Sequence, residues 1–533
     1  MPSAAPLLTV ICNVHNDAAR LPRAVGSALA ACEGPDVEVL VVDDGSTDDT
    51  GAVADRLAAE DERVRVVHRG VNDGAPGAPR NLGLDEARGD WVAFVDSDDT
   101  YVSGSLRRLL ESAVAQDADV AAGAVARYNE RTDRVTPLPA TGYTAGAVEP
   151  LSPGSPLWQD TIAVAKVMRR ALLDEHAIRF PEGILYEDQP FTVALWSTAR
   201  RIATLDEVVY HWYVNNVAGE ESITARRHEI TNFHDRLAAN RAIDVQLTSR
   251  PDLAPAKLDK FVRHDLSLYG KDLDARDAGY RAAFLAAVRD YLTELPAELR
   301  EGLDQPYRLA VRELVDGSSE SAVAACLFAY RRLHVDRPLE QRDERWWWPY
   351  RPAGEASADH DLTTVVATEH ARRRRIWTTT CRAVRVEEDA LHLTGTVVDG
   401  DHGIGARARL AVSLVDRDTS ARLSSAVARL RPDGAFDAAL ALPSRDSAAT
   451  PATAWDVRVD VVGALRSRLP VRTRKPHPVE LPTTVALPSL DGIEVYRTRN
   501  GNLSIRPSGD RARHDADDGS GARDGAGPAG GAG

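Results

Sequence analysis

The chain is poor in cysteine, and it carries no excess of positive charge. Its 533 residues include four cysteines, Cys12, Cys32, Cys326 and Cys381, whose scattered positions match neither a metal site nor a disulfide framework. This usage favours a reducing, cytosolic compartment. With 65 basic and 80 acidic residues the net charge is −15. Because non-specific binding to nucleic acid requires positive charge, we expect no nucleic-acid partner.

Long apolar runs and several catalytic motifs are also absent. No segment approaches the roughly 20 apolar residues that a membrane span needs, and the N-terminal segment lacks the pattern of a signal peptide. We therefore expect a cytoplasmic protein, with peripheral contact at the inner face of the membrane left open. The chain has neither a phosphate loop nor a nucleophile elbow. The zinc-protease pattern fails because Asn232 stands where a second histidine would follow His228.

The chain is too long for one hydrophobic core, so several domains are expected. Apolar runs alternate with helical stretches over residues 7–100, which predicts an α/β domain with a Rossmann-like, mostly parallel sheet. Further on, the apolar spacing becomes helical and then alternates with period two, as in an antiparallel β-sandwich. The predicted parts are a catalytic domain at 1–230, a helical linker domain at 231–345, a linker at 346–376, a β-sandwich at 377–505 and a disordered tail at 506–533.

Three parts of the predicted linker and sandwich could contact other molecules or domains. We expect Trp346, Trp347 and Trp348 to pack at an interface, with sugar stacking as the alternative. The run from Arg372 to Arg375 is expected to be a solvated face, with binding of anionic lipid or polymer phosphate as the alternative. A terminal sandwich often binds, spaces or oligomerises, so a homo-oligomer through this domain stays open.

A cluster of acids directly follows the predicted strand over 91–95. Asp96, Asp98 and Asp99 come within four positions. Ligands of such sheets bind at the carboxyl ends of the strands, and carboxylate and phosphate oxygens are the ligands that Mg²⁺ and Mn²⁺ prefer. Asp96 and Asp98 are therefore candidate ligands of a metal bound to a diphosphate. The alternative is a polar turn in which Asp98 or Asp99 caps the helix that starts near Ser105.

Three other segments carry candidate chemistry. After the predicted strand over 37–42, Asp44 can accept a hydrogen bond from a uracil or a ribose, or it can cap a glycine turn. Arg80 falls in the first turn of a predicted helix, where the helix dipole disfavours it and a nearby diphosphate would explain it. Glu187 and Asp188 precede an apolar helical run, either as a general base for an acceptor hydroxyl or as a helix N-cap.

Together these segments resemble the inverting nucleotide-sugar glycosyltransferases of family two, which have the GT-A fold. The likeness covers roughly residues 7–225 and rests on five segments in family order, TVICNVHND (9–17), VVDDGSTD (41–48), RNLGLDEARGD (80–90), VAFVDSDD (92–99) and YEDQPF (186–191). The layout of catalytic domain, helical linker and sandwich is also similar to that of the wall-teichoic-acid glycosyltransferases that decorate poly(ribitol phosphate).

The resemblance implies a role for each candidate residue. Those expected to hold the UDP-sugar are Asn13, Asp44, Asn72, Arg80, Asp96 and Ser97, with Arg226, Arg227 and His228 reaching phosphates from a lid or simply starting a basic helix. Asp96 and Asp98 would bind Mn²⁺ or Mg²⁺, and Asp188 would be the general base, with Glu187 beside it. The family usually shows Pro-x-Tyr-Asn in its first loop, whereas this chain has Asn13 and His15 at the proline and tyrosine positions. The contact that stacks on the base is therefore altered, although an imidazole can also stack.

The expected activity is a metal-dependent, inverting transfer of a hexosyl or N-acetylhexosaminyl group. The favoured donor is UDP-N-acetylglucosamine. The expected acceptor is a hydroxyl of an anionic surface polymer, such as a polyol phosphate of the teichoic-acid type, or of another cell-wall polysaccharide. One alternative is a nucleotidyltransferase that acts on a sugar phosphate. A second is a non-catalytic glycan-binding protein, which should bind glycan through residues 377–505 without metal or UDP-sugar.

Overall fold

The computed structural model describes most of the chain in two compact units, residues 1–261 and residues 262–533. The described residues are 7–34, 36–130, 133–138, 143–148, 150–214, 226–331, 337–352, 354–371, 377–387, 390–399, 409–416, 422–442, 454–462, 477–478, 489–490, 493–497 and 503–507. The run at 372–375 and the tail beyond 507 lie outside these residues.

The first unit is an α/β domain. Its strands are β1 (Leu8–Val14), β2 (Val37–Asp44), β3 (Val64–Arg69), β4 (Trp91–Asp96), β5 (Thr100–Tyr101), β6 (Val120–Asn129), β7 (Arg134–Pro137), β8 (Gly146–Val148), β9 (Lys166–Arg169) and β10 (Ile202–Tyr213). Its helices are α1 (Leu21–Ala31), α2 (Thr50–Glu60), α3 (Gly77–Glu86), α4 (Ser105–Ala115), α5 (Arg170–Glu175), α6 (Asp188–Thr198), α7 (Ile230–Gln246) and α8 (Ala254–Lys260).

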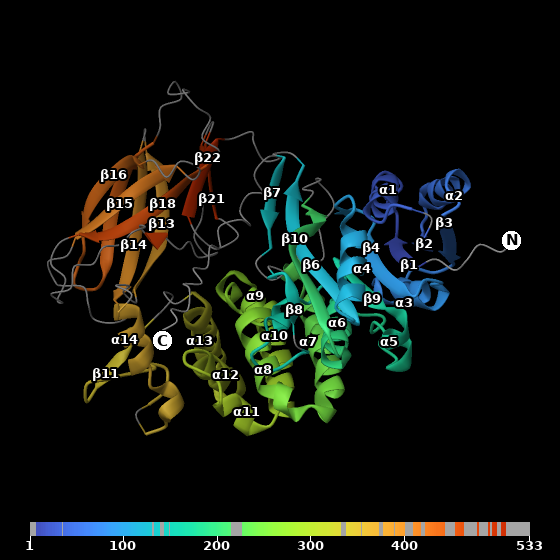
Figure 1. Ribbon diagram of the computed structural model, residues 1–533. Helices are drawn as coiled ribbons and strands as arrows, with labels where there is room; N and C mark the ends of the chain where they lie inside the picture. The colour runs from blue at the N-terminus through green and yellow to red at the C-terminus, as the bar shows by residue number, and fades with distance from the viewer. Residues whose placement is uncertain are drawn as a thin grey trace. The chain divides into compact units, whose positions relative to one another are not determined.

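The predicted alternation of strands and helices in the first hundred residues is confirmed. Strands β3, β2, β1 and β4 lie side by side in that order and are parallel. Figure 1 shows α1 and α2 above these strands and α3 below them. The sheet is mixed rather than parallel throughout, because the short strand β9 inserts antiparallel between β4 and β6.

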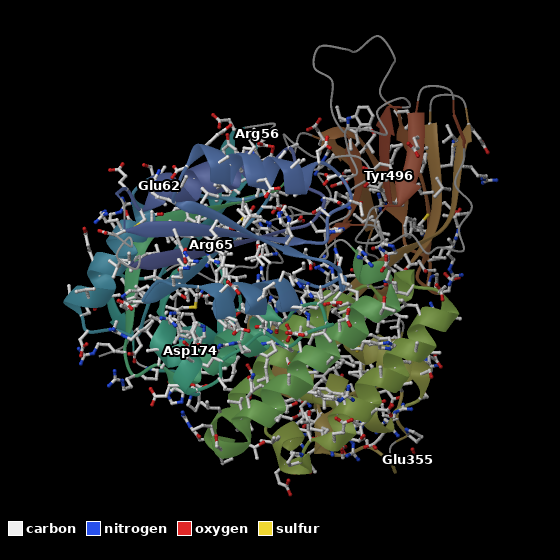
Figure 2. The ribbon with its side chains drawn as sticks, turned by 90° about the vertical axis from the view of Figure 1, so that its right-hand side faces the viewer. Arg56, Glu62, Arg65, Asp174, Glu355 and Tyr496 are labelled. Carbon is white, nitrogen blue, oxygen red and sulfur yellow. The ribbon has the colours of Figure 1, made fainter. Side chains whose placement is uncertain are left out.

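The strand register places the candidate residues at one edge of this sheet. Asn13 at the end of β1 lies opposite Val42 of β2 on one side and Asp96 of β4 on the other. Parallel sheets of this kind are covered on both faces, and β2 is accordingly buried along its whole length. The outer strand β3 is more open, and Figure 2 shows its Arg65, which pairs with Glu86 at 3.1 Å.

The second unit combines helices with antiparallel sheets. Its helices are α9 (Ser267–Gly270), α10 (Ala278–Glu294), α11 (Ala297–Glu301), α12 (Tyr307–Asp316), α13 (Ser319–Arg331) and α14 (Thr363–Ala371). Its strands are β11 (Glu340–Arg342), β12 (Arg345–Trp347), β13 (Trp377–Glu387), β14 (Ala390–Asp399), β15 (Arg409–Asp416), β16 (Arg422–Arg429), β17 (Ala435–Ala441), β18 (Trp455–Val462), β19 (His477–Pro478), β20 (Ser489–Leu490), β21 (Ile493–Arg497) and β22 (Leu503–Pro507).

The predicted sandwich is confirmed. Strands β13, β14 and β17 form one antiparallel sheet, and β15, β16 and β18–β22 form another. The two sheets share a core, in which Leu391 of the first sheet and Val457 and Val459 of the second are fully buried. The alternation of valine with charged residues in β18 follows from this arrangement, because side chains of one strand point to opposite faces in turn.

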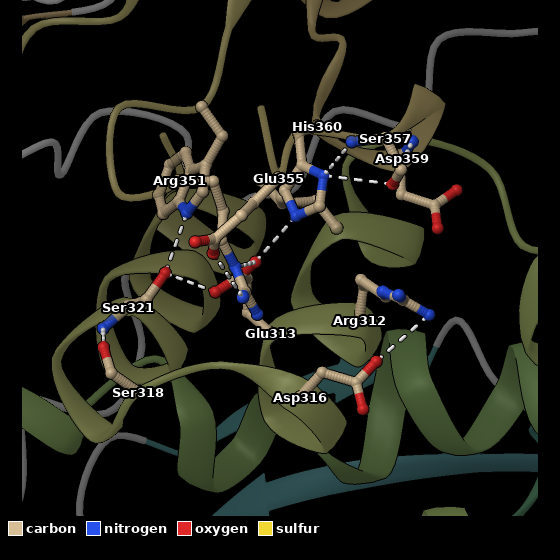
Figure 3. A network of polar contacts seen from close by, with 12 residues as sticks. Arg312, Glu313, Asp316, Ser318, Ser321, Arg351, Glu355, Ser357, Asp359 and His360 are labelled. Carbon is tan, nitrogen blue, oxygen red and sulfur yellow. Dashed lines mark hydrogen bonds and ion pairs between the residues drawn. The ribbon is translucent and has the colours of Figure 1, made fainter. Parts of the chain in front are cut away.

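A buried polar network holds the segment after β12 to the helices of the same unit (Figure 3). The fully buried carboxylate of Glu313 accepts hydrogen bonds from His360 Nε2 at 2.9 Å, from Arg351 Nε at 3.0 Å and from Ser321 Oγ. Trp348 is fully buried and donates its indole N–H to Ser321 at 3.0 Å. Trp348 therefore packs in a core of this unit, and packing of the run at a domain interface stays a prediction.

Candidate active site

One buried arginine joins the two acidic segments of the first unit. Arg80 of α3 is 4% exposed, and its guanidinium contacts Asp96 at 2.7 Å, Glu187 at 2.5 Å and Asp188 at 2.5 Å. We refer to these four residues as the Arg80 cluster. Burial alone would lower the pKa of Arg80, but the three carboxylates raise it overall. The cation in the first turn of α3 is therefore explained by its acidic partners, although the helix dipole disfavours it there.

The two adjacent acids of the Arg80 cluster differ in exposure. The Glu187 side chain is 4% exposed, whereas that of Asp188 is 24% exposed. Burial and the neighbouring charge of Asp188 raise the pKa of Glu187 to about 8, although Arg80 opposes the shift. Neither residue makes the capping hydrogen bond of the alternative interpretation. Asp188 is therefore the carboxylate that a bound molecule can reach.

The acids after β4 have separate roles in the structure. Asp99 is 3% exposed and accepts hydrogen bonds from Tyr210 Oη at 3.0 Å and from the Tyr213 N–H at 2.8 Å. Burial and the nearby charge of Asp96 raise the pKa of Asp98 to about 6. The capping alternative for these acids is wrong, because the N-cap residue of α4 is Gly104, and no side chain caps this helix.

Residues of the first loop and α1 support the segment after β4. Ser97 Oγ donates to Asp17 at 2.7 Å, and Arg20 holds the same carboxylate at 2.7 Å. Arg23 donates to the main-chain oxygen of Asp98 at 2.7 Å. Ser97 was expected to hold the UDP-sugar, whereas no pattern in the sequence pointed to Arg20 or Arg23. The only signal was that Asp17 ends the first of the family-like segments.

On the other side of β1, the candidate nucleotide residues surround the end of β2. Arg69 pairs with Asp44, and burial raises the pKa of Asp44 despite this partner. His15 donates through Nδ1 to the main-chain oxygen of Asp44 at 3.0 Å. Asn72 accepts a hydrogen bond from the Gly74 N–H at 2.5 Å. The Oδ1 atom of Asn13 is buried and has no hydrogen-bond partner among the described residues.

The turn after β2 also approaches Asn72 closely. Gly45 has φ of +66°, and a Cβ at this position would lie 3.2 Å from the Asn72 nitrogen. Only glycine meets both requirements easily. By contrast, the contacts described for the predicted lid residues are local, since Arg226 pairs with Glu229 at 2.8 Å and His228 lies 4.0 Å from the same carboxylate.

The carboxylates fit a divalent cation only if other ligands complete its coordination. Among the residues that the structure describes, no group of three or more His, Cys, Asp or Glu side chains is arranged to hold a metal ion. Asp96 and Asp98 supply two hard oxygen donors, and the like charge that raises the pKa of Asp98 is what a cation would relieve. Diphosphate oxygens and water would fill the remaining positions, as Mg²⁺ and Mn²⁺ sites commonly require.

Comparison with known proteins gives the following matches. The family model described as glycosyl transferase family 2 matches residues 9–176. The chain is 30% identical to the succinoglycan biosynthesis protein ExoU of Rhizobium meliloti over 308 residues, which is 54% of this chain and 86% of that protein. It is also 30% identical over 220 residues to the poly(ribitol-phosphate) beta-glucosyltransferase of Bacillus spizizenii, covering 40% of this chain and 33% of that protein. Across several curated relatives the chain spans between 32% and 62% of their length.

The solved structures of Staphylococcus aureus TarS share the fold. One aligns with 94% of this chain and 85% of its own, with a TM-score of 0.55 and 18% identity. A TarS fragment in complex with UDP-GlcNAc aligns with 66% of this chain and 98% of its own, with a TM-score of 0.55 and 24% identity. Within the described residues of the present chain, no helix combines the length and apolar character that crossing a membrane requires.

Proposed function

Because the chain belongs to glycosyl transferase family 2, we propose that it transfers a sugar from a UDP-sugar to a hydroxyl group, with inversion at the anomeric carbon. The Arg80 cluster is the observation that carries this proposal. Its guanidinium contacts Asp96 at the end of β4 and Asp188 at the start of α6, two residues that are 92 positions apart in the sequence. A carboxylate suited to a metal–diphosphate and a carboxylate suited to proton transfer thus share one counterion.

The donor would lie along the ends of β1, β2 and β4. Asp44 and Asn72 would face the uridine, and Asn13 would offer its unpaired Oδ1 to the ribose or diphosphate. A divalent cation held by Asp96 and Asp98 would supply the charge that stabilises the departing diphosphate. Titrating UDP into the protein with and without Mn²⁺ tests this arrangement. Affinity that does not depend on the metal would contradict it.

Asp188 would act as the general base. Its side chain is 24% exposed, and its Oδ2 atom accepts a long hydrogen bond, 3.3 Å, from the Ala163 N–H. An acceptor hydroxyl beside this carboxylate would lose its proton as the oxygen attacks the anomeric carbon from the face opposite the diphosphate. The transition state would resemble an oxocarbenium ion, as in glycoside hydrolysis. Glu187, whose side chain is 4% exposed, would be less accessible to that hydroxyl than Asp188.

For the substrates, the names of relatives give the best support. The TarS proteins are described as poly(ribitol-phosphate) beta-N-acetylglucosaminyltransferases, and one TarS fragment was solved with UDP-GlcNAc. We propose UDP-N-acetylglucosamine as donor and a polyol-phosphate polymer as acceptor, with other UDP-hexoses and other surface polysaccharides as the next candidates. No specific observation favours a nucleotidyltransferase or a glycan-binding protein.

The test is a screen for release of nucleotide from a set of nucleotide sugars, with poly(ribitol phosphate) as acceptor and with either Mn²⁺ or EDTA present. We expect release from UDP-N-acetylglucosamine that depends on both metal and polymer. Pyrophosphate release from nucleoside triphosphates in the same screen would instead support a nucleotidyltransferase. Full activity in EDTA would refute the metal part of the proposal while leaving the transfer itself intact.

A further inference from the structure

The residue just before the acid pair has a backbone conformation that its side chain disfavours. Tyr186 has φ of +67°, in the left-handed region that bulky residues rarely adopt. Residues persist in such conformations only where the surrounding structure holds them, and they gather at functional sites.

Helix α7 supplies those contacts from two residues that are one helical turn apart. Tyr186 Oη donates to Asn232 Oδ1 at 2.8 Å, and the guanidinium carbon of Arg236 lies 3.5 Å from the centre of the Tyr186 ring. Asn232 is 2% exposed and Arg236 is 6% exposed. Residues four apart lie on the same helical face. One face of α7 therefore contacts both the hydroxyl group and the ring face of Tyr186.

The neighbouring residue is tied to the same helix. The N–H of Leu185 faces the carboxylate of Asp235, the residue just before Arg236, and lowers its pKa against burial, which raises it overall. Tyr186 and its neighbour Leu185 thus both face one turn of α7. The direction of the chain as it enters α6 is set there.

That direction fixes the position of the acid pair. The Gln189 N–H donates to the main-chain oxygen of Tyr186 at 3.1 Å, and the Phe191 N–H donates to that of Glu187 at 3.4 Å. Asp188 is the first residue of α6, so its backbone follows directly from the turn at Tyr186. A rotation of Tyr186 would carry the Asp188 carboxylate away from the acceptor side.

At its other end, the same loop is held by α3. Asn81, next to Arg80, exchanges hydrogen bonds of 2.9 Å with the main-chain N–H and oxygen of Phe180 and donates to Glu182 at 2.9 Å. Because this end is fixed by α3, the contacts with α7 decide how the remaining part of the loop presents Asp188.

We propose that Tyr186, Asn232 and Arg236 are positioning residues, which act on the reaction by aiming the Asp188 carboxylate at the acceptor hydroxyl. The inference rests on the proposed role of Asp188 as general base. Displacing a catalytic group by about 1 Å can cost on the order of 100-fold in rate. We therefore expect Tyr186→Phe and Arg236→Met each to lower kcat by about 10- to 100-fold, with the affinity for UDP unchanged.

A double-mutant cycle separates this role from a general loss of structure. UDP release from UDP-N-acetylglucosamine is measured with poly(ribitol phosphate) and with water alone as acceptor, for Tyr186→Phe in the native and in the Asp188→Asn background. If Tyr186 acts through Asp188, its substitution lowers the rate only where Asp188 is present. Arg276→Met is the matched control, because Arg276 lies over the ring of Tyr280, 5.2 Å from its centre, in the other unit. We expect native kcat from this control.

The outcomes are distinct. A Tyr186→Phe protein that keeps native kcat, or one that loses the same factor with and without Asp188, overturns the proposal. Native turnover in Asp188→Asn would instead refute the general base and leave the family activity standing. If Tyr186→Phe melts at a lower temperature, Arg236→Met is used for the same kcat measurement in its place. Arg236→Lys should have a higher kcat than Arg236→Met, because lysine restores a cation above the ring.

Discussion

Replacing Arg80 by glutamine should destabilise the first unit in a manner that depends on pH. The side chain is 4% exposed and contacts three carboxylates, of which Glu187 is also 4% exposed. Removing one partner of a buried ion pair typically costs about 3–5 kcal/mol, because the remaining charge stays buried without compensation. At about 2–4 °C per kcal/mol for a unit of this size, the melting temperature should fall by roughly 6–20 °C.

The sign of the pH dependence follows from Glu187. Its pKa in the folded protein is about 8, above the ordinary value of 4.5. Stability is therefore lost as pH rises between these two values, because the folded state binds the proton more tightly than the unfolded state. Without Arg80 this pKa rises further, so the difference between the variant and the native protein should be larger at pH 8.5 than at pH 5.5.

The assay is thermal unfolding of both proteins across this pH range, with Arg108→Gln as control. Arg108 pairs with Glu207 at 2.6 Å, but its side chain is 42% exposed, so its loss should cost at most about 1 kcal/mol. Adding Glu187→Gln to Arg80→Gln should restore part of the stability at pH 8.5, since the buried carboxyl that must take up a proton on folding is removed. A loss in the single variant that is small, or that does not change with pH, would refute this account of the cluster.

Three further predictions concern other parts of the chain. Asp98→Ala should lose the Mn²⁺-dependent part of its UDP affinity in calorimetry and keep the metal-free part. Glu313→Gln should cost about 3–5 kcal/mol near pH 7 and less in acid. The pKa of Glu313 is lowered in the folded protein, so the stability it contributes is lost as the pH falls below the pKa of the unfolded state. Urea unfolding at both pH values checks this. Gly77→Ala should cost about 1–3 kcal/mol and reduce turnover, because the new Cβ would lie 2.4 Å from the Pro181 oxygen. Gly26→Ala, whose Cβ would have nothing within 4 Å, should leave stability and turnover intact.

The sheet and the sandwich could be predicted because their signals are local. The apolar run at 37–42 predicts a strand buried on both faces, and the structure has β2 there. The alternation at 455–461 predicts a strand buried on one face, and the structure has β18 there. Strand β9 escaped prediction because it has only four residues, Lys166–Arg169, and pairs antiparallel with strands distant in sequence. Nothing in so short a run specifies its partners.

The candidate site divides in the same way. The acids at the ends of β2 and β4 could be placed from sequence, because parallel strands end at one edge of the sheet. The ion pairs of Arg80 with residues more than 100 positions away could not, since no periodicity encodes which side chains meet across the fold. The same holds for the contact of Tyr186 with α7. These long-range contacts give the site its geometry.

The most direct test of the central claim is the turnover of Asp188→Asn, measured as UDP release together with UDP affinity. A general base contributes typically 10²–10⁴-fold in rate, so kcat should fall by about that factor. The affinity for UDP in Mn²⁺ should stay close to that of the native protein, because the proposed donor site lies at the ends of β1, β2 and β4. Native turnover in Asp188→Asn, or a loss of UDP binding that accounts for the lost rate, would contradict the claim.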